Sequence, residues 1–231
     1  MVKENILKIK EHISLACAKI KQDPGKITIV AVSKDRTIGQ IKEAIEAGVT
    51  DIGENRVQEA LSKYNELTAY DLQLTTTKWH MVGHLQTNKA KDAVKIFDLI
   101  QSVDSLRLAQ AIDKEAAKLG KIQDILLEIK TSPEESKTGL KAEEAIEVIE
   151  DIARMKNINI KGLMTIAPLA DNPEKTRPYF RMLRELRDKV NALTTSDKRL
   201  TTLSMGMTDD FEIAIEEGSN MVRLGRAIFE G

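Results

Sequence analysis

Apolar and polar residues follow two regular patterns along the chain. Within segment 3–21, Ile6, Ile9 and Ile13 recur at helical spacing among lysines and glutamates, which predicts an amphipathic helix. Cys17 is expected to pack on or beside its apolar face as a small hydrophobic side chain. From residue 27 onward, short apolar runs alternate with segments of helical spacing, which is typical of parallel strand–helix units.

Eight of these apolar runs are predicted strands, at residues 27–33, 50–55, 78–83, 97–103, 122–129, 158–166, 199–205 and 220–225. Helices are predicted over 37–47, a segment ending at Tyr64, 86–96, 105–119, 141–155, 173–192 and 209–217. This pattern predicts an α/β protein, a single (β/α)8 TIM barrel with an additional N-terminal helix, forming one domain over residues 1–231. An open doubly wound sheet is the alternative, and the number of strands disfavours it.

Composition and charge exclude several classes of function. The 35 Lys and Arg residues nearly balance 36 Asp and Glu residues, the basic residues are spread out, and aromatic content is 3%, so no nucleic-acid partner is expected. No apolar run approaches the length of a membrane span, and the N-terminus lacks the apolar core of a signal peptide. The single cysteine excludes an intrachain disulfide and a multi-cysteine metal site, so a cytoplasmic protein is expected.

Lys34 follows the first predicted strand, in the run ITIVAVSK. The strand residues are almost all β-branched or small, which predicts a strand buried on both faces. Barrels place their chemistry at the carboxyl ends of such strands, and a partly desolvated lysine amine forms Schiff bases. The alternative is a surface lysine that opens a helix.

Polar or otherwise distinctive residues gather at the other predicted strand ends. They are Glu54 and Asn55, then His80, Gly83 and His84, then Met164 and Thr165, then Ser204, Gly206 and Thr208, and finally Arg223 and Gly225. Because parallel strands end at the same mouth of a barrel, these residues are expected to converge. Each also has a structural explanation: Asn55 could cap a helix, His80 could be a hydrogen-bonded core residue, and Arg223 could pair with a core carboxylate.

The run SMGMTDD places a glycine and hydroxyl groups just before a predicted helix. Barrels often bind phosphate at the loops after their seventh and eighth strands, where backbone N–H groups are free. Gly225 and Arg226 would add further backbone donors. The alternative is helix capping, by Thr208 or by a capping box formed by Asp209 and Glu212.

These stretches together resemble a known family. The motifs VAVSK, GEN-x-VQEA, KWH-x-VGHLQTNK, EESKTG, GLMTIAP and LSMGM-x-DDFE-x-AI-x-x-GS-x-x-VR-x-G-x-AIF occur in the order found in pyridoxal 5′-phosphate (PLP) homeostasis proteins. The resemblance runs from residue 27 to the C-terminus. The family is similar in fold to the barrel domain of alanine racemase, the fold type III class of PLP proteins.

The resemblance implies a set of cofactor contacts. Lys34 would hold PLP covalently as an internal aldimine, with Asn55 beside the cofactor and with His80 and Met164 lining the ring pocket. The phosphate would be held by Ser204, Gly206, Gly225 and the backbone of Arg226, together with the amide of Met205 or Met207. Arg223 would face the pyridine nitrogen. Because arginine stays protonated, it would leave that nitrogen unprotonated and weaken the ring as an electron sink.

The chain departs from the family pattern at three places. Arg56 stands where a tyrosine is expected after GEN, Asp35 stands where a threonine is usual, and the end reads IFEG rather than IFG. These departures concern the lining near the second strand and the extreme C-terminus. The polar segment Ser132–Gly139 is predicted to be a solvated loop, and its position at the same mouth would also suit a mobile cover.

Enzyme and carrier functions make different demands on the chain. Alanine racemase-type enzymes need a second acid/base, a tyrosine from an additional domain across a dimer, because inversion requires proton transfer on both faces. Tyr64, Tyr70 and Tyr179 fall in or near predicted helices, and no additional domain is predicted. The lack of a clear second base favours a non-catalytic PLP carrier that acts in PLP homeostasis by buffering or delivery and contacts PLP-dependent apoenzymes transiently, and the resemblance implies the same role. A monomer is expected because the domain that builds the racemase dimer is not predicted. Two alternatives are a PLP-dependent racemase or lyase with His80 as the second base, and a Schiff-base aldolase without PLP.

Overall fold

The computed structural model describes residues 1–70, 76–132, 134, 138–193 and 199–230, which contain nine parallel strands. The strands are β1 (Thr28–Val32), β2 (Asp51–Glu54), β3 (Lys78–Met81), β4 (Leu99–Val103), β5 (Gln123–Lys130), β6 (Leu140–Lys141), β7 (Ile158–Met164), β8 (Thr202–Ser204) and β9 (Met221–Leu224). Every predicted strand is present. The predicted strand over 199–205 is shorter than expected, and β6 was not predicted.

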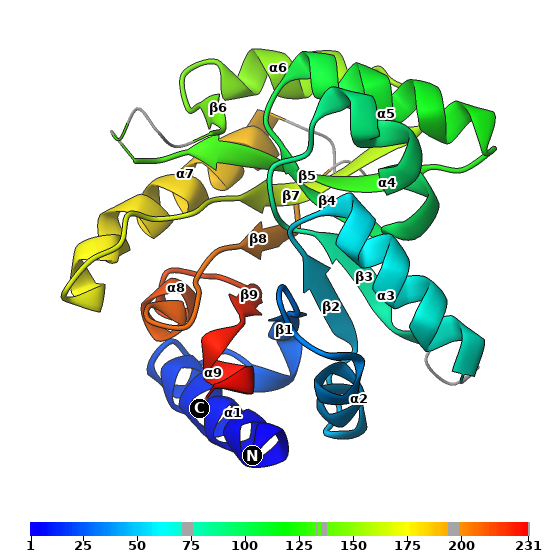
Figure 1. Ribbon diagram of the computed structural model, residues 1–231. Coiled ribbons are helices and arrows are strands. Elements are labelled where there is room, and N and C mark those ends of the chain that lie inside the picture. Colours follow the sequence, from blue (N-terminus) through cyan, green and yellow to red (C-terminus); the bar gives the residue numbers. More distant parts are fainter. Residues whose placement is uncertain (71–75, 133, 135–137, 194–198, 231) are drawn as a thin grey trace.

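The strands form a closed barrel (Figure 1). Neighbours run in the order β4-β3-β2-β1-β9-β8-β7-β5, and the pairing of β5 with β4 closes the ring. The short β6 pairs with the end of β5 outside the ring. The predicted (β/α)8 barrel with an N-terminal helix is confirmed, and the open doubly wound alternative is wrong.

Helices surround the barrel (Figure 1). They are α1 (Val2–Lys19), α2 (Ile38–Glu46), α3 (Val57–Tyr70), α4 (Ala90–Ile96), α5 (Leu106–Lys118), α6 (Ala145–Ile152), α7 (Arg177–Leu193), α8 (Phe211–Glu216) and α9 (Arg226–Phe229), with 3-10 turns η1 (Pro24–Lys26), η3 (Thr87–Lys89) and η4 (Pro173–Thr176). A capping box of Thr37 and Gln40 starts α2, and the Ser105 hydroxyl caps α5. None of the described helices is both long and apolar enough to cross a membrane.

The apolar side chains form two layers. The smaller cluster fills the inside of the barrel and consists of Val30, Val82, Leu99, Leu126, Met164 and Met221. The larger cluster lies between the barrel and the helices and includes Ile52, Ile100 and Phe180. Because each strand is covered on both faces, apolar residues lie on both faces, as the continuous apolar runs predicted, although the inner face also carries buried polar residues such as His80 and Gln101.

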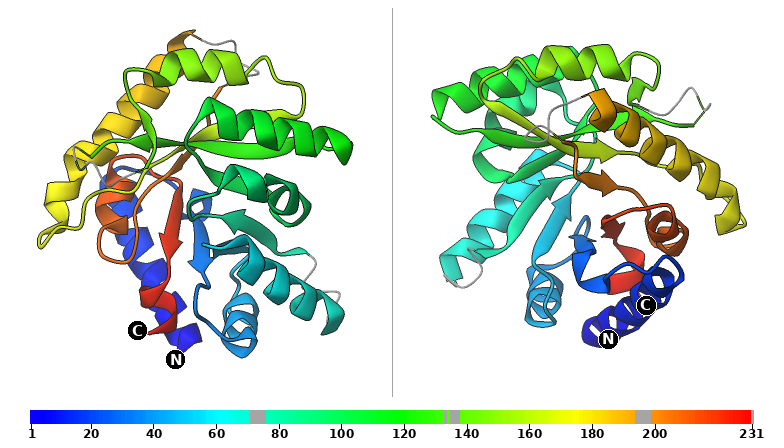
Figure 2. Two further views of the ribbon diagram at one scale, coloured as in Figure 1. Left: turned by 45° about the horizontal axis from the view of Figure 1, so that its top comes forward. Right: turned by 180° about the vertical axis from the view of Figure 1, so that it is seen from behind.

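Helix α1 completes the outer layer beside the end of the chain. Figures 1 and 2 show α1 alongside α9, with the two termini close together. The side-chain amide of Asn5 donates to the carbonyl of Ile228 at 3.1 Å, and the Lys19 ammonium lies 2.6 Å from a Glu216 carboxylate oxygen on α8. Cys17 is fully buried on the apolar face of α1, as predicted, and burial raises the pKa of its thiol.

Candidate functional site

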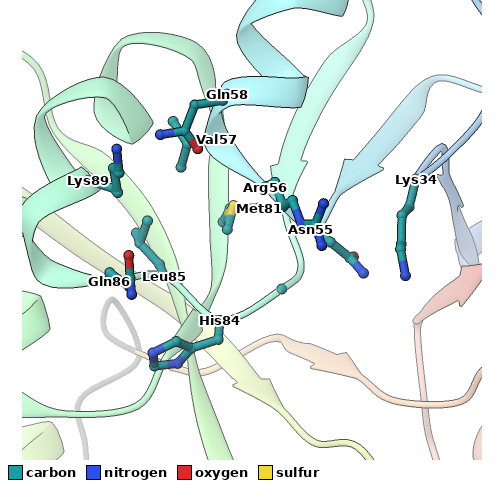
Figure 3. Close-up of a pocket in the computed structure, with 11 residues that line it drawn as sticks. Lys34, Asn55, Arg56, Val57, Gln58, Met81, His84, Leu85, Gln86 and Lys89 are labelled. Atoms are coloured by element: carbon teal, nitrogen blue, oxygen red, sulfur yellow. The ribbon is translucent and has the colours of Figure 1, made fainter.

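Lys34 lies just beyond the carboxyl end of β1, where the sequence placed it. Its side chain is 46% exposed, and its ammonium is 3.8 Å from the carboxylate of Asp35. Asp35 has a positive φ of 58°, so the chain turns sharply after Lys34. Lys34 borders a pocket of about 450 Å³ (Figure 3).

The other walls of this pocket come from the carboxyl end of β3 and from the segments that follow β2 and β3. They are Asn55, Arg56, Val57, Gln58, Met81, Gly83, His84, Leu85, Gln86 and Lys89. Figure 3 shows the polar ends of Lys34 and Asn55 pointing toward one another. A Cβ atom on Gly83 would lie 2.5 Å from the Asn55 carbonyl oxygen, so only glycine allows the two segments to approach this closely. The structure therefore brings Asn55 to Lys34, as predicted. Asn55 could also have been the N-cap of the following helix, but α3 begins at Val57, so Arg56 and not Asn55 directly precedes it.

A buried ion cluster fixes the turn that carries Lys34. The Lys63 ammonium, from α3, donates to the Ser33 carbonyl at 2.6 Å and to carboxylate oxygens of Glu54 and Glu59 at 2.7 Å each. The backbone amide of Asp35 donates to the same Glu59 oxygen at 3.0 Å. Both residues next to Lys34 are therefore tied to α3 through charge-assisted hydrogen bonds.

Burial dominates the electrostatics of this cluster. Glu54 has no exposed surface, and its Oε2 atom has no hydrogen-bond partner among the described residues. Burial raises the pKa of the Glu54 carboxyl, although Lys63 and Ser33 oppose the change by donating to its other oxygen. Burial also acts to raise the pKa of Glu59, but the bonds from Lys63 and the Asp35 amide outweigh it and lower the pKa.

A chain of hydrogen bonds crosses the interior of the barrel. Arg223 Nη1 donates to Ser204 Oγ at 2.7 Å, and Ser204 Oγ donates to Gln101 Oε1 at 2.6 Å. Gln101 Nε2 lies 2.8 Å from His80 Nδ1, and His80 Nε2 lies 2.8 Å from Asp51 Oδ1. With the His80 proton on Nε2, every donor points the same way, from the buried guanidinium to the buried carboxylate. These hydrogen bonds thus connect a buried cation at one end to a buried carboxylate at the other.

Arg223 is the cationic end of this chain. Its second terminal nitrogen donates to the Thr165 carbonyl at 2.8 Å. No carboxylate oxygen of a described residue lies within 4.0 Å of the guanidinium, so the direct ion pair considered from the sequence is absent in the described part of the chain. Burial lowers the pKa of Arg223 to about 10, and the more distant Asp210 and Glu128 act against that change. The side chain therefore remains charged at neutral pH.

His80 and Met164 do not border the Lys34 pocket. His80 lines a separate cavity of about 840 Å³ at the amino ends of the strands, together with Asp51, Lys78 and Lys161. Its two ring nitrogens are bonded to Asp51 and Gln101, so the structural explanation weighed for His80 agrees with its position. Met164 is fully buried in the apolar cluster inside the barrel.

The loop after β8 uses most of the groups expected to hold phosphate for its own bonds. The Ser204 hydroxyl is bonded to Gln101 and Arg223, and the Met205 amide donates to the Met221 carbonyl at 3.1 Å. The Met207 amide donates to the Asp210 carboxylate at 2.6 Å. The predicted capping box of Asp209 and Glu212 is wrong, because α8 begins after Asp210, and the Asp210 side chain does not cap the helix.

Gly206, Gly225 and Arg226 remain as candidate phosphate donors. Gly206 has φ of +93°, and a Cβ there would lie 2.6 Å from the Ala214 Cβ, so this turn requires glycine. The amides of Gly206 and Arg226 donate to no acceptor among the described residues. Gly225 starts the short helix α9, and the Arg226 side chain pairs with Asp209. The predicted loop Ser132–Gly139 lies partly outside the described residues.

Three residues that shape the site were not predicted from the sequence. Glu59 and Lys63 are four residues apart on α3, a spacing that indicates a helical ion pair but not its connection to the Lys34 turn. Gln101 is a polar residue within the strand run LIQSV, and a buried amide there indicates an internal hydrogen-bond network. Among the described residues, no group of acidic, histidine or cysteine side chains could hold a metal ion.

Comparisons with known proteins agree with this architecture. Residues 2–231 match the family described as the alanine racemase N-terminal domain. The chain is 41% identical over 226 residues to the pyridoxal phosphate homeostasis protein of Aquifex aeolicus, covering 98% of this chain and 96% of that one. It is 36% identical over 229 residues to the protein of the same name from Escherichia coli K12, covering 99% and 95%.

Solved structures give the same result at the level of the fold. The PLP-bound structure of PipY from Synechococcus elongatus has a TM-score of 0.86 and 34% identity, covering 99% of this chain and 100% of that chain. An alanine racemase from Clostridium difficile has a TM-score of 0.72 and 17% identity, and the chain covers 58% of its length, so this likeness concerns the barrel alone. The chain therefore belongs to the pyridoxal phosphate homeostasis protein family and is built on the alanine racemase N-terminal domain.

Proposed function

We propose that this chain is a single-domain PLP carrier that holds the cofactor on Lys34 as a lysine aldimine and acts in PLP homeostasis by buffering or delivery. The observation that carries the proposal is the position of Lys34, half-exposed at the barrel mouth on a turn that is tied to α3. A fixed backbone with an accessible amine suits reversible attachment of an aldehyde. PLP-bound PipY and the names of the relatives support the same cofactor.

The residues around the mouth fit the cofactor. PLP brings an aldehyde, a phosphate and a pyridine nitrogen that can act as part of an electron sink. Gly206 and Arg226 would hold the phosphate through backbone amides that are not already bonded among the described residues, with Gly225 beside them. Arg223 is a buried cation without a carboxylate partner in the described structure, so an acceptor nitrogen of a ligand suits its remaining hydrogen-bonding capacity.

A carrier role agrees with the groups that surround Lys34. Racemisation needs a second acid/base on the far side of the cofactor. His80, the candidate considered from the sequence, has both ring nitrogens bonded inside the barrel and borders a different cavity. We therefore propose a carrier and not a racemase. The carrier would act in the cytoplasm as a monomer and would contact PLP-dependent apoenzymes transiently.

An absorption spectrum with added PLP, before and after borohydride reduction, tests the proposal. Wild-type protein should show an aldimine band and, after reduction, a pyridoxyl group on the peptide that contains Lys34. Lys34→Ala should show neither, whereas the control Lys91→Ala, an exposed α4 lysine, should behave as wild type. An unchanged band in Lys34→Ala would remove the proposed anchor, and robust turnover of an amino acid by the loaded protein would contradict the carrier role.

A further inference from the structure

The pocket beside Lys34 is lined with cationic and amide side chains. Arg56 and Lys89 lie in the lining together with Lys34 itself, and the amides of Asn55, Gln58 and Gln86 face the same space. No aspartate or glutamate is among the described residues that line it. Figure 3 shows Lys89 and Gln86 on the wall opposite Lys34. This lining suits a negatively charged ligand.

Two of the three lysine and arginine side chains that line this pocket have no ion-pair partner among the described residues, whereas Lys34 lies 3.8 Å from the Asp35 carboxylate. Among the described residues, no carboxylate oxygen lies within 4.0 Å of Arg56 or Lys89. Glu59 is the acidic residue that acts on Arg56 through space, but its Oε1 atom already accepts from Lys63 and from the Asp35 amide. Arg56 and Lys89 are therefore available to an outside anion.

The backbone adds to this charge. Val57 and Gln58, in the first turn of α3, also line the pocket. The amino end of a 14-residue helix carries a partial positive charge from its unpaired N–H groups, and that charge adds to Arg56 and Lys89.

The pocket is separate from the loops expected to hold the cofactor phosphate. Its lining comes from the end of β3 and from the segments after β1, β2 and β3, whereas Gly206, Gly225 and Arg226 follow β8 and β9 and do not line it. Lys34 and Asn55 are the predicted cofactor contacts that border the pocket. An anion held by Arg56 and Lys89 would therefore lie beside a cofactor on Lys34 and would not replace its phosphate.

We propose that Arg56 and Lys89 form a second anion site, which binds a small molecule bearing a carboxylate or phosphate group while PLP occupies Lys34. The inference rests on the proposed function for the position of the cofactor. The planar guanidinium of Arg56 matches two oxygens of such a group, and the Lys89 ammonium supplies a point charge. Arg56 stands at the position where the family pattern leads us to expect a tyrosine.

Titration of the PLP-saturated, ¹⁵N-labelled protein tests the site, with inorganic phosphate in one series and acetate in the other. Saturable shifts are expected for the amide signals of Gly83 and Gln86, and the stronger of the two anions identifies the preferred group. Arg56→Glu with Lys89→Glu should weaken binding about tenfold or more, because two attractive charges become repulsive. Lys91→Glu, two residues from Lys89 and outside the pocket, is the matched control and should bind as wild type.

The outcomes separate this inference from the proposed function. The double variant should keep the cofactor on Lys34. Loss of PLP binding in that variant, and equally in the neutral variant Arg56→Gln with Lys89→Gln, would assign the pocket to the cofactor itself and overturn the second site. Absence of saturable shifts, or shifts confined to Gly206 and Gly225, would also overturn it. Failure of Lys34 to bind PLP would instead refute the proposed function, and the same titration of the PLP-free protein would still test the anion site.

Discussion

The two mouths of the barrel differ in how their charges are arranged. The cavity at the amino ends of the strands, about 840 Å³, is larger than the pocket of about 450 Å³ at the carboxyl ends. Most of its charged groups have partners inside the protein: Asp51 is bonded to His80, the Lys161 ammonium lies 4.0 Å from Asp124, and Lys121 donates to the Val94 carbonyl at 2.8 Å. Lys78 is the exception among its described lining residues.

The smaller pocket has cations without such partners. Arg56 and Lys89 have no carboxylate oxygen within 4.0 Å among the described residues, and the predicted anchor Lys34 lies beside them. Charged side chains without an ion-pair partner are a better indicator of a ligand site than cavity volume, because a side chain that is already paired gains little from a ligand. The difference also agrees with the rule that barrel chemistry is located at the carboxyl ends.

The largest effect is expected from Lys63→Met. This change leaves the Glu54 carboxylate buried without its cation, so the free energy of unfolding should fall by about 3–5 kcal/mol. Lys121→Met at the opposite mouth loses a bond to a backbone carbonyl and should cost about 1 kcal/mol. Urea denaturation measures both values.

A second variant controls for the lost lysine itself. Glu54→Gln combined with Lys63→Met removes both charges and should regain much of the stability. The ion-cluster interpretation fails if Lys63→Met costs no more than Lys121→Met, or if the double variant is as unstable as the single one.

The two buried carboxyls should respond to pH in opposite directions. Burial acts to raise the pKa of Asp51, but bonds from His80 and Thr50 outweigh it and lower the pKa. Its stabilising contribution is therefore present above the unfolded pKa of about 4 and is lost as pH falls through the folded pKa. The pKa of Glu54 is raised mainly by burial, so its contribution is present below the unfolded pKa and is lost as pH rises through the folded pKa.

Unfolding free energies at neutral and acidic pH measure this difference. On acidification, wild type should lose its advantage over Asp51→Asn and should gain relative to Glu54→Gln, each by on the order of 1 kcal/mol per unit of pKa change. If acidification changed the stability difference from Asp51→Asn and the stability difference from Glu54→Gln in the same direction, the two carboxyls would share one kind of environment.

The smallest effect is expected from Lys161→Gln at the amino-end cavity. The Lys161 side chain is 45% exposed and its carboxylate partner is 4.0 Å away, so the free energy of unfolding should change by about 0.5 kcal/mol or less. PLP retention, followed by absorbance after gel filtration, should not change. A marked loss of PLP would show that the larger cavity contributes to the site.

The sequence alone predicted the barrel and the position of Lys34. Apolar runs of strand length, each followed by a helical pattern, predicted every strand of the ring, and VAVSK placed Lys34 at a carboxyl end. Boundaries were less well predicted: the seventh predicted strand, 199–205, is β8 at Thr202–Ser204, and the helix over 141–155 is α6 at Ala145–Ile152. Terminal residues of an element are decided by hydrogen bonds that the hydrophobic pattern does not describe.

Only the tertiary structure decided which polar groups meet. Ser204 bonds Gln101 across 103 positions of sequence, and Lys63 bonds the Ser33 carbonyl across 30. Side chains along a strand point alternately into the barrel and toward the helices. His80 joins the hydrogen-bond chain that leads to Arg223 only because the register of the closed barrel points its side chain inward. The hydrophobic pattern determines that strands form, whereas closure of the ring determines which of their polar side chains share the interior.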